Sequence, residues 1–175
     1  IYACGEAHQI DFIGASFSAS NNTLRFWLAN NFTPAWLGLR PDTATGLNSV
    51  QVIQPISHGA KALKHQLKCH FKGYLDFGKS MWFTSVDAET WQGIYPKFTH
   101  AAAAMLNVEQ QQRLLILLAK GHAGFSGPLH LLYQQQLNDK DKQLVMHAAQ
   151  NNTHKGLQKD VRRLALSLLP PESEQ

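Results

Sequence analysis

Cysteine, long apolar runs and catalytic motifs are scarce or missing in this chain. Its 175 residues include only two cysteines, Cys4 and Cys69, so at most one disulfide can form within it. The longest apolar run, residues 114–119, has six residues, whereas a membrane-spanning helix needs roughly 18. Charged residues make up 16% and hydrophobic residues 44%, a balance that excludes general disorder. The composition therefore predicts an ordered, soluble protein with no transmembrane segment.

Short catalytic and metal-binding motifs are missing as well. The glycine-rich residues 121–128 contain Ser126 but lack the G-x-S-x-G of a serine hydrolase and the Gly-Lys-Ser/Thr of a phosphate loop. We therefore interpret Ser126 as a helix cap. The nine histidines form no HExxH or HxH pair, and no CxxC occurs, so no local metal site is predicted. No cofactor is expected, and a catalytic function is not favoured.

The N-terminus and the cysteines together favour export. The chain begins at Ile1 rather than at Met, which fits the removal of a signal peptide. Pairing Cys4 with Cys69 would close a loop whose entropy contributes about 4 kcal/mol to stability. The alternative is two free thiols that pack as small apolar groups. We predict a secreted or periplasmic protein with a Cys4–Cys69 disulfide.

Strand patterns dominate the chain before residue 98. Residues 24–28, 50–53 and 81–86 are short segments rich in strand-favouring side chains. The longest pattern covers residues 63–77, where apolar side chains occupy odd positions and polar ones even positions. A helix is the alternative, because apolar residues also recur there at spacings of four, four and three. Gly73 would weaken such a helix, so the strand is favoured.

Helical spacing replaces alternation after residue 98. Helices are predicted after Thr99, after Asn107, after Ser126, after Asn138 or Asp139, and over residues 157–168, before Pro170 and Pro171. Strands grouped before helices predict an α+β class. We expect an N-terminal antiparallel sheet or partial sandwich (residues 1–98), a helical subdomain packed on it (residues 99–169), and an acidic, disordered tail (residues 170–175).

Positive charge gathers in one segment of the chain. Residues 61–79 carry a net charge of +4, equal to that of the whole chain. In a strand, Lys64, Lys68 and Lys72 share a polar face with His70, and this stripe could meet an anionic partner. The alternative is a solvated face that protects a sheet edge from aggregation.

A second group of cations lies on the last predicted helix, on the face opposite its leucines. Its members are Lys155, Lys159, Arg162 and Arg163. A nucleic-acid partner is not expected, because no aromatic side chains are interleaved with these cations and the overall charge is low.

Two pairs of residues complete the candidate sites. Trp27, together with Trp36, could form an apolar recognition patch, unless both are buried between layers. Glu6 and His8 point to the same side of an extended segment, where burial would shift their pKa values and permit acid–base chemistry.

These observations predict an exported, non-catalytic binding protein that resembles an adaptor or an inhibitor. It would engage another protein or an anionic surface component through the residues identified above: Lys64, Lys68, His70, Lys72, Trp27 and Trp36. The alternative is a small enzyme or ligand carrier that uses Glu6 and His8 in a pocket between sheet and helices.

Overall fold

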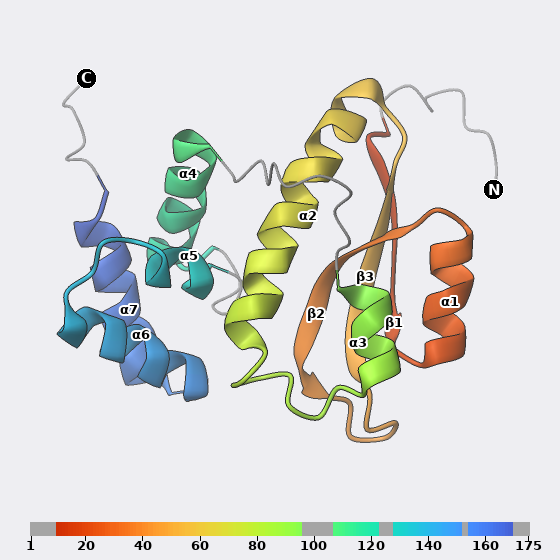
Figure 1. Ribbon diagram of the computed structural model, residues 1–175. Helices are drawn as coiled ribbons and strands as arrows, with labels where there is room; N and C mark the ends of the chain where they lie inside the picture. Colours follow the sequence, from red (N-terminus) through yellow and green to blue (C-terminus); the bar gives the residue numbers. More distant parts are fainter. Residues whose placement is uncertain (1–9, 96–106, 123–127, 152–153, 170–175) are drawn as a thin grey trace. The chain divides into compact units, whose positions relative to one another are not determined.

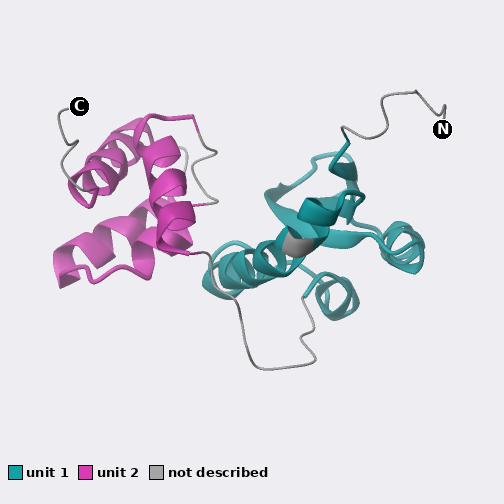
Figure 2. Ribbon diagram, turned by 90° about the horizontal axis from the view of Figure 1, so that it is seen from above, with its two compact units in different colours: residues 1–105 teal, residues 106–175 magenta. Residues whose placement is uncertain are grey.

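The computed structural model describes residues 10–95, 107–122, 128–151 and 154–169 (Figure 1). The chain divides into two compact units, Ile1–Met105 and Leu106–Gln175 (Figure 2). Strands occur in the first unit and are followed along the chain by several helices, so the predicted α+β class is confirmed. Among the described residues, none of the helices combines the length and the apolar character needed to cross a membrane.

Unit 1 is built on a three-stranded antiparallel sheet. The strands β1 (Phe12–Ser18), β2 (Thr33–Pro41) and β3 (Asn48–Pro55) lie in the order β1-β3-β2 (Figure 1). Because β3 is antiparallel to both neighbours, β1 and β2 run parallel to each other. The helix α1 (Asn21–Ala29) connects them, which makes a split β-α-β unit with β3 inserted in its middle.

One face of the sheet forms the core of unit 1. Val50 of β3 lies between Phe17 of β1 and Leu37 of β2, and the Val50 and Leu37 side chains are fully buried. Residues directly opposite one another in antiparallel strands share a face. Trp36 lies opposite the exposed Gln51, so the two side chains are on the other face of the sheet.

The segment predicted as the longest strand is instead part of a 21-residue helix, α2 (His58–Gly78). The Ser57 hydroxyl caps it by accepting a hydrogen bond from the Ala60 N–H. The prediction failed because apolar residues spaced by four share a face at both the helical and the strand period. Gly73 is tolerated inside the helix at a cost of about 1 kcal/mol. The buried side of α2 carries Phe71, Tyr74 and Leu75.

Two further strand predictions are also wrong. Residues 24–28 lie in α1, because the Ser20 hydroxyl accepts from the Thr23 N–H and starts a helix at Asn21. Residues 81–86 form turns rather than a strand, and the Trp82 N–H donates to the Gly78 carbonyl at 2.7 Å. The prediction for residues 50–53 is confirmed, since they lie within β3.

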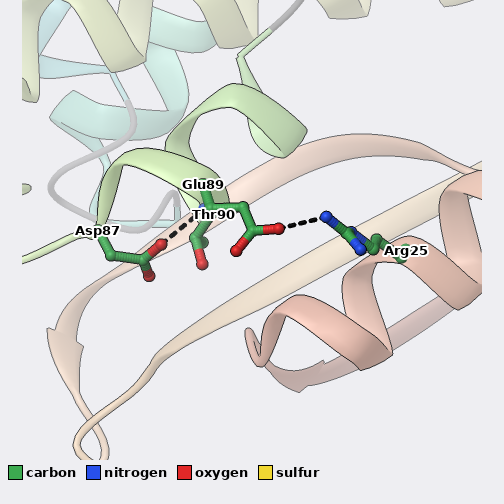
Figure 3. Close-up of polar contacts among 4 residues, drawn as sticks. All are labelled: Arg25, Asp87, Glu89 and Thr90. Carbon is green, nitrogen blue, oxygen red and sulfur yellow. Dashed lines mark hydrogen bonds and ion pairs between the residues drawn. The ribbon is translucent and has the colours of Figure 1, made fainter.

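A short helix, α3 (Ala88–Ile94), is held against α1 by a polar clamp (Figure 3). The Asp87 carboxylate caps α3 by accepting from the Thr90 N–H at 2.9 Å, and this bond lowers the pKa of Asp87. Glu89 accepts a hydrogen bond from the Arg25 guanidinium of α1 (Figure 3). This ion pair joins α3 to α1.

Unit 2 contains four helices in its described residues: α4 (Val108–Ala119), α5 (Leu129–Tyr133), α6 (Asp139–Gln150) and α7 (Lys155–Ser167). The predicted helix after Asn107 is confirmed, and it starts at a capping box in which Asn107 and Gln110 exchange hydrogen bonds. Asn138 caps α6 as expected. The buried side chains of the core come from all four helices: Leu115, Leu118, Leu129, Leu132, Val145, Val161 and Ala165.

Three of the predicted features of this region lie outside the described residues. They are the helix after Thr99, the cap at Ser126 and the acidic tail.

Candidate functional site

The cations of α7 line one surface pocket. The helix places Val161 and Ala165 in the core of unit 2, which turns its charged side chains outward. A pocket of about 540 Å³ is lined from α7 by Lys155, Gln158, Lys159, Arg162, Arg163 and Leu166, and from α4 by Ala119. Lys155, Lys159 and Arg163 are exposed, and Arg162 is half-buried. The pocket is therefore a concentration of positive charge open to solvent.

Little negative charge opposes these cations on their own helix. Asp160 is the one acidic residue of α7, and its carboxylate lies 3.9 Å from the Arg163 guanidinium. Both side chains are more than half exposed, so solvent screens this pair and it contributes at most about 1 kcal/mol. Arg163 consequently keeps most of its capacity to attract an anion.

Arg162 is positioned by the turn that ends α4. Gly121 adopts a left-handed conformation, with φ of 74°, and a Cβ placed there would lie 3.2 Å from the Arg162 Cζ. The guanidinium thus lies next to the C-terminal end of α4, which favours positive charge through the helix dipole. Its Nε is buried and has no hydrogen-bond partner among the described residues.

The three lysines of the predicted stripe remain together, but His70 is separated from them. Lys64, Lys68 and Lys72 recur at spacings of four, so they share a face of α2. Lys72 donates to the Asp76 carboxylate at 2.5 Å, and this bond raises the pKa of Lys72. His70 lies elsewhere on the helix, and its burial lowers its pKa. The stripe was predicted on one face of a strand. In the helix, that set of residues is divided: the three lysines share a face, and His70 does not lie on it.

Trp27 and Trp36 do not form one patch. Trp27 is half-buried and stacks on Phe17, with ring centroids 5.9 Å apart, on the core side of the sheet. Trp36 lies with Gln51 on the other face. The predicted patch is therefore wrong, because a helix replaced the strand on which Trp27 was placed.

The remaining candidate residues are only partly described by the structure. Cys69 is half-buried on α2, while Cys4, Glu6 and His8 lie outside the described residues. The disulfide and the acid–base pair remain predictions. Among the described residues, none of the His, Cys, Asp and Glu side chains gather in a group of three that could hold a metal ion.

Comparison with known proteins gives partial matches to tRNA-modifying enzymes. The tRNA(Met) cytidine acetyltransferase TmcA of Methanopyrus kandleri is 36% identical over 62 residues, which are 35% of this chain and 7% of that enzyme. TmcA of Saccharolobus islandicus is 35% identical over 69 residues, 39% of this chain and 9% of that enzyme. TmcA of Vibrio cholerae is 40% identical over 47 residues, 27% of this chain and 7% of that enzyme.

These matches are short relative to the enzymes themselves. The chain spans less than a tenth of the length of each of these relatives. No model of a known protein family matches the chain.

The matches correct four predictions. An exported, non-catalytic binding protein is wrong, because the relatives are named as acetyltransferases that act on tRNA. The secreted or periplasmic location and the removed signal peptide are contradicted on the same ground. The expectation that nucleic acid is not a partner is contradicted too. That expectation weighed the low charge of the whole chain and the lack of aromatic side chains among the cations, whereas nucleic-acid binding also depends on how cations are grouped on one face.

Proposed function

We propose that this chain is part of a tRNA-modifying acetyltransferase and that the cationic pocket of α7 holds the RNA backbone. One observation supports this function most strongly: four cations from a single helix line one pocket, in a chain whose relatives are named for acting on tRNA. Because the chain spans 7% of that relative, the proposal for the chain itself is limited to RNA binding.

The residue types suit phosphate contacts. Arg162 and Arg163 each offer several N–H donors in a planar fork that can bind two phosphate oxygens at once. Lys155 and Lys159 add flexible point charges to the same pocket. From Lys155 to Arg163 the helix rises about 12 Å, enough for the cations to follow a few successive phosphates. Contacts of this kind position RNA without reading its sequence.

The apolar part of the pocket suits the sugar and base portions of a nucleotide. Leu166 is 61% exposed at its edge, and Ala119 contributes a small side chain from α4. An exposed leucine side chain leaves apolar surface in contact with water. Covering it with a ribose or a base removes that surface from water, which is favourable. The pocket thus combines charge for phosphate with an apolar surface for the rest of the nucleotide.

Charge reversal on α7 tests the proposal. A tRNA(Met) transcript is titrated with the full chain, and binding is followed by fluorescence anisotropy at fixed salt. The double variant K159E/R163E is expected to bind at least about 100-fold more weakly, because repulsion replaces two charge-assisted hydrogen bonds to phosphate.

The matched control reverses two cations of the same unit outside the pocket. Lys140 and Lys142 lie on α6 beside Asp139 and Asp141, and K140E/K142E makes the same change in net charge. Its affinity is expected to stay within about threefold of the unaltered chain, since charges away from the bound strand are largely screened at physiological salt. Equal reductions in the two double variants would contradict the proposed site.

A further inference from the structure

A second pocket, within unit 1, combines aromatic walls with a cation. It has a volume of about 290 Å³ and is lined by Leu28, Phe32, Thr33, Pro34, Lys68, Gln92, Gly93, Ile94 and Tyr95. We propose that it holds one unstacked nucleobase of a bound RNA, with the neighbouring phosphate at Lys68. This inference rests on the proposed function for the identity of the partner, but on a different set of residues.

The aromatic walls are held in place before any ligand binds. Phe32 packs edge-on against Trp27, with ring centroids 4.6 Å apart. Tyr95 stacks on Trp91 at 5.8 Å, and its hydroxyl donates to the Asp76 carboxylate at 2.7 Å. Rings that are already ordered lose little conformational entropy when they accept a base.

Close packing of α3 on α1 brings two sides of the pocket lining together. Gly93 lies so near α1 that a Cβ there would be 2.7 Å from the Leu24 Cδ2. The ion pair of Arg25 with Glu89 joins the same two helices (Figure 3). The wall formed by Gly93, Ile94 and Tyr95 is therefore fixed relative to Leu28.

The charges around the pocket favour an anionic, planar ligand. Lys68 lines the pocket, and the Lys72 ammonium lies 5.4 Å from the Tyr95 ring centroid. Asp76 is hydrogen-bonded to both Lys72 and Tyr95, so its charge is compensated. A base can stack on Phe32, beside the Tyr95 wall, while its phosphate approaches Lys68, the combination that single-stranded nucleic-acid sites use.

The size and the polar groups of the pocket also fit a single base. Its volume is close to the lower limit of about 300 Å³ for small-molecule sites, so it suits one base rather than a larger ligand. Gln92 offers an amide that both donates and accepts hydrogen bonds, and Thr33 offers a hydroxyl. These groups can meet the polar edge of a base, while Leu28 and Pro34 contact its apolar surface.

Titration of the full chain with cytidine 5′-monophosphate, followed by ligand-observed NMR, tests this site. Ribose 5-phosphate and cytidine are the two partial probes. The monophosphate is expected to bind about tenfold more tightly than either, because stacking and the phosphate contact each contribute. Equal affinity for the monophosphate and ribose 5-phosphate would show that no base is held and would overturn the proposal.

Substitutions on α2 locate the phosphate. K68A is expected to weaken monophosphate binding about tenfold and to leave cytidine binding unchanged, whereas K64A, one turn away and outside the pocket, alters neither. Equal effects of K68A and K64A would overturn the assignment.

Substitutions of phenylalanine locate the base. F32L is expected to weaken cytidine and monophosphate binding alike, by roughly fivefold or more. The control is F26L, because Phe26 is 59% exposed and does not line the pocket. Urea unfolding of each variant shows whether the fold is kept. If F32L unfolds, Y95F and Y95L replace it, since only the second removes a ring.

The two proposals fail separately. Retained monophosphate binding with unchanged tRNA affinity in K159E/R163E overturns the proposed function and not the pocket. Loss of tRNA affinity in K159E/R163E without monophosphate binding overturns the pocket and not the proposed function.

Discussion

The two groups of cations in this chain, on α2 and on α7, are similar in sequence and different in structure. On α2, Lys72 is bonded to Asp76 and lies over Tyr95, and Lys68 faces an aromatic pocket. On α7, four cations line one open pocket, and the helix itself carries a single, weakly paired acid. The density of positive charge along a sequence therefore says less about binding than the positions that the charges take in the fold.

The side chains around each helix explain the difference between the two groups of cations. The buried side of α2 carries large aromatic side chains. On its other side Lys72 is engaged by Asp76 of the same helix and by the Tyr95 ring. The buried side of α7 carries the smaller Val161 and Ala165, and its cations extend away from that side. We therefore propose that α7 binds the RNA backbone and that the pocket lined by Lys68 of α2 binds a single nucleotide.

The largest expected effect is the difference in tRNA(Met) affinity between a variant with two charges reversed on α7 and a variant with two charges reversed on α2. K61E/K64E on α2 should lower tRNA(Met) affinity by less than about threefold, while K159E/R163E lowers it by about 100-fold or more. Lys61 and Lys64 are chosen because neither lines a described pocket. Filter binding at one salt concentration measures the tRNA(Met) affinity of both double variants. A similar reduction in each would erase the distinction between the two surfaces.

The second prediction concerns the turn that positions Arg162. G121A is expected to destabilise the chain by about 1–2 kcal/mol, because alanine is strained at positive φ and its Cβ would press on the Arg162 guanidinium. Urea unfolding measures the free energy, and anisotropy measures the accompanying decrease in tRNA affinity.

The control for that turn is G46A. Gly46 has φ of 68° but nothing lies within 4 Å of the added Cβ, so the backbone strain is retained without a clash. G46A should destabilise the chain by about 1 kcal/mol and leave tRNA affinity unchanged. If G121A also left affinity unchanged, Arg162 would have no part in the site.

Much of α7 could be predicted from the sequence, and much of α2 could not. Leu157, Val161, Leu164 and Leu168 recur at spacings of four, three and four, which only a helix places on one face. On α2 the spacing of four between Leu63, Leu67 and Phe71 fits both periods, and the polar residues between them completed a false alternation. Ser57 is a local start signal for the helix, but only a tertiary contact, the hydrogen bond of the Tyr74 hydroxyl to the Leu37 carbonyl of β2, decides between the two.

The base pocket illustrates a second limit of the sequence. Its two aromatic walls, Phe32 and Tyr95, are 63 positions apart, and nothing local marks them as neighbours. Their approach depends on the β1-β3-β2 order and on the clamp between Arg25 and Glu89. The cations of α7, by contrast, were evident in the sequence, because they recur along a single predicted helix.

The third prediction concerns His70, a half-buried titratable group of α2. Burial lowers its pKa below the ordinary 6.5, so the folded chain resists a proton that the unfolded chain binds. The free energy of unfolding therefore has its full value above about pH 6.5 and falls as the pH drops toward the folded-state pKa.

Urea midpoints at pH 7.5 and pH 5.5 measure this effect. The variant H70Q should lose part of the pH dependence, and H65Q, an exposed position on the same helix, should keep it. Identical pH dependence in H70Q and the unaltered chain would rule out His70 as the cause.

The smallest expected effect comes from removing the hydrogen bond between Lys72 and Asp76. D76N removes the carboxylate whose hydrogen bond raises the pKa of Lys72, so that pKa should fall toward its ordinary value. Because both side chains are more than one-third exposed, the decrease in stability should be under about 1 kcal/mol. NMR titration of the Lys72 side chain follows the pKa, and an unchanged value would mean that Asp76 does not engage it in solution.

The salt dependence of tRNA(Met) binding measures how many phosphates the α7 cations hold. Removing one phosphate contact should reduce the slope of log affinity against log salt by about 0.7 to 0.9. The triple variant K155A/K159A/R163A should therefore bind with a slope smaller by about 2 to 3, while K61A/K64A keeps the slope of the unaltered chain. An unchanged slope in the α7 variant would contradict the assignment of RNA backbone binding to this helix.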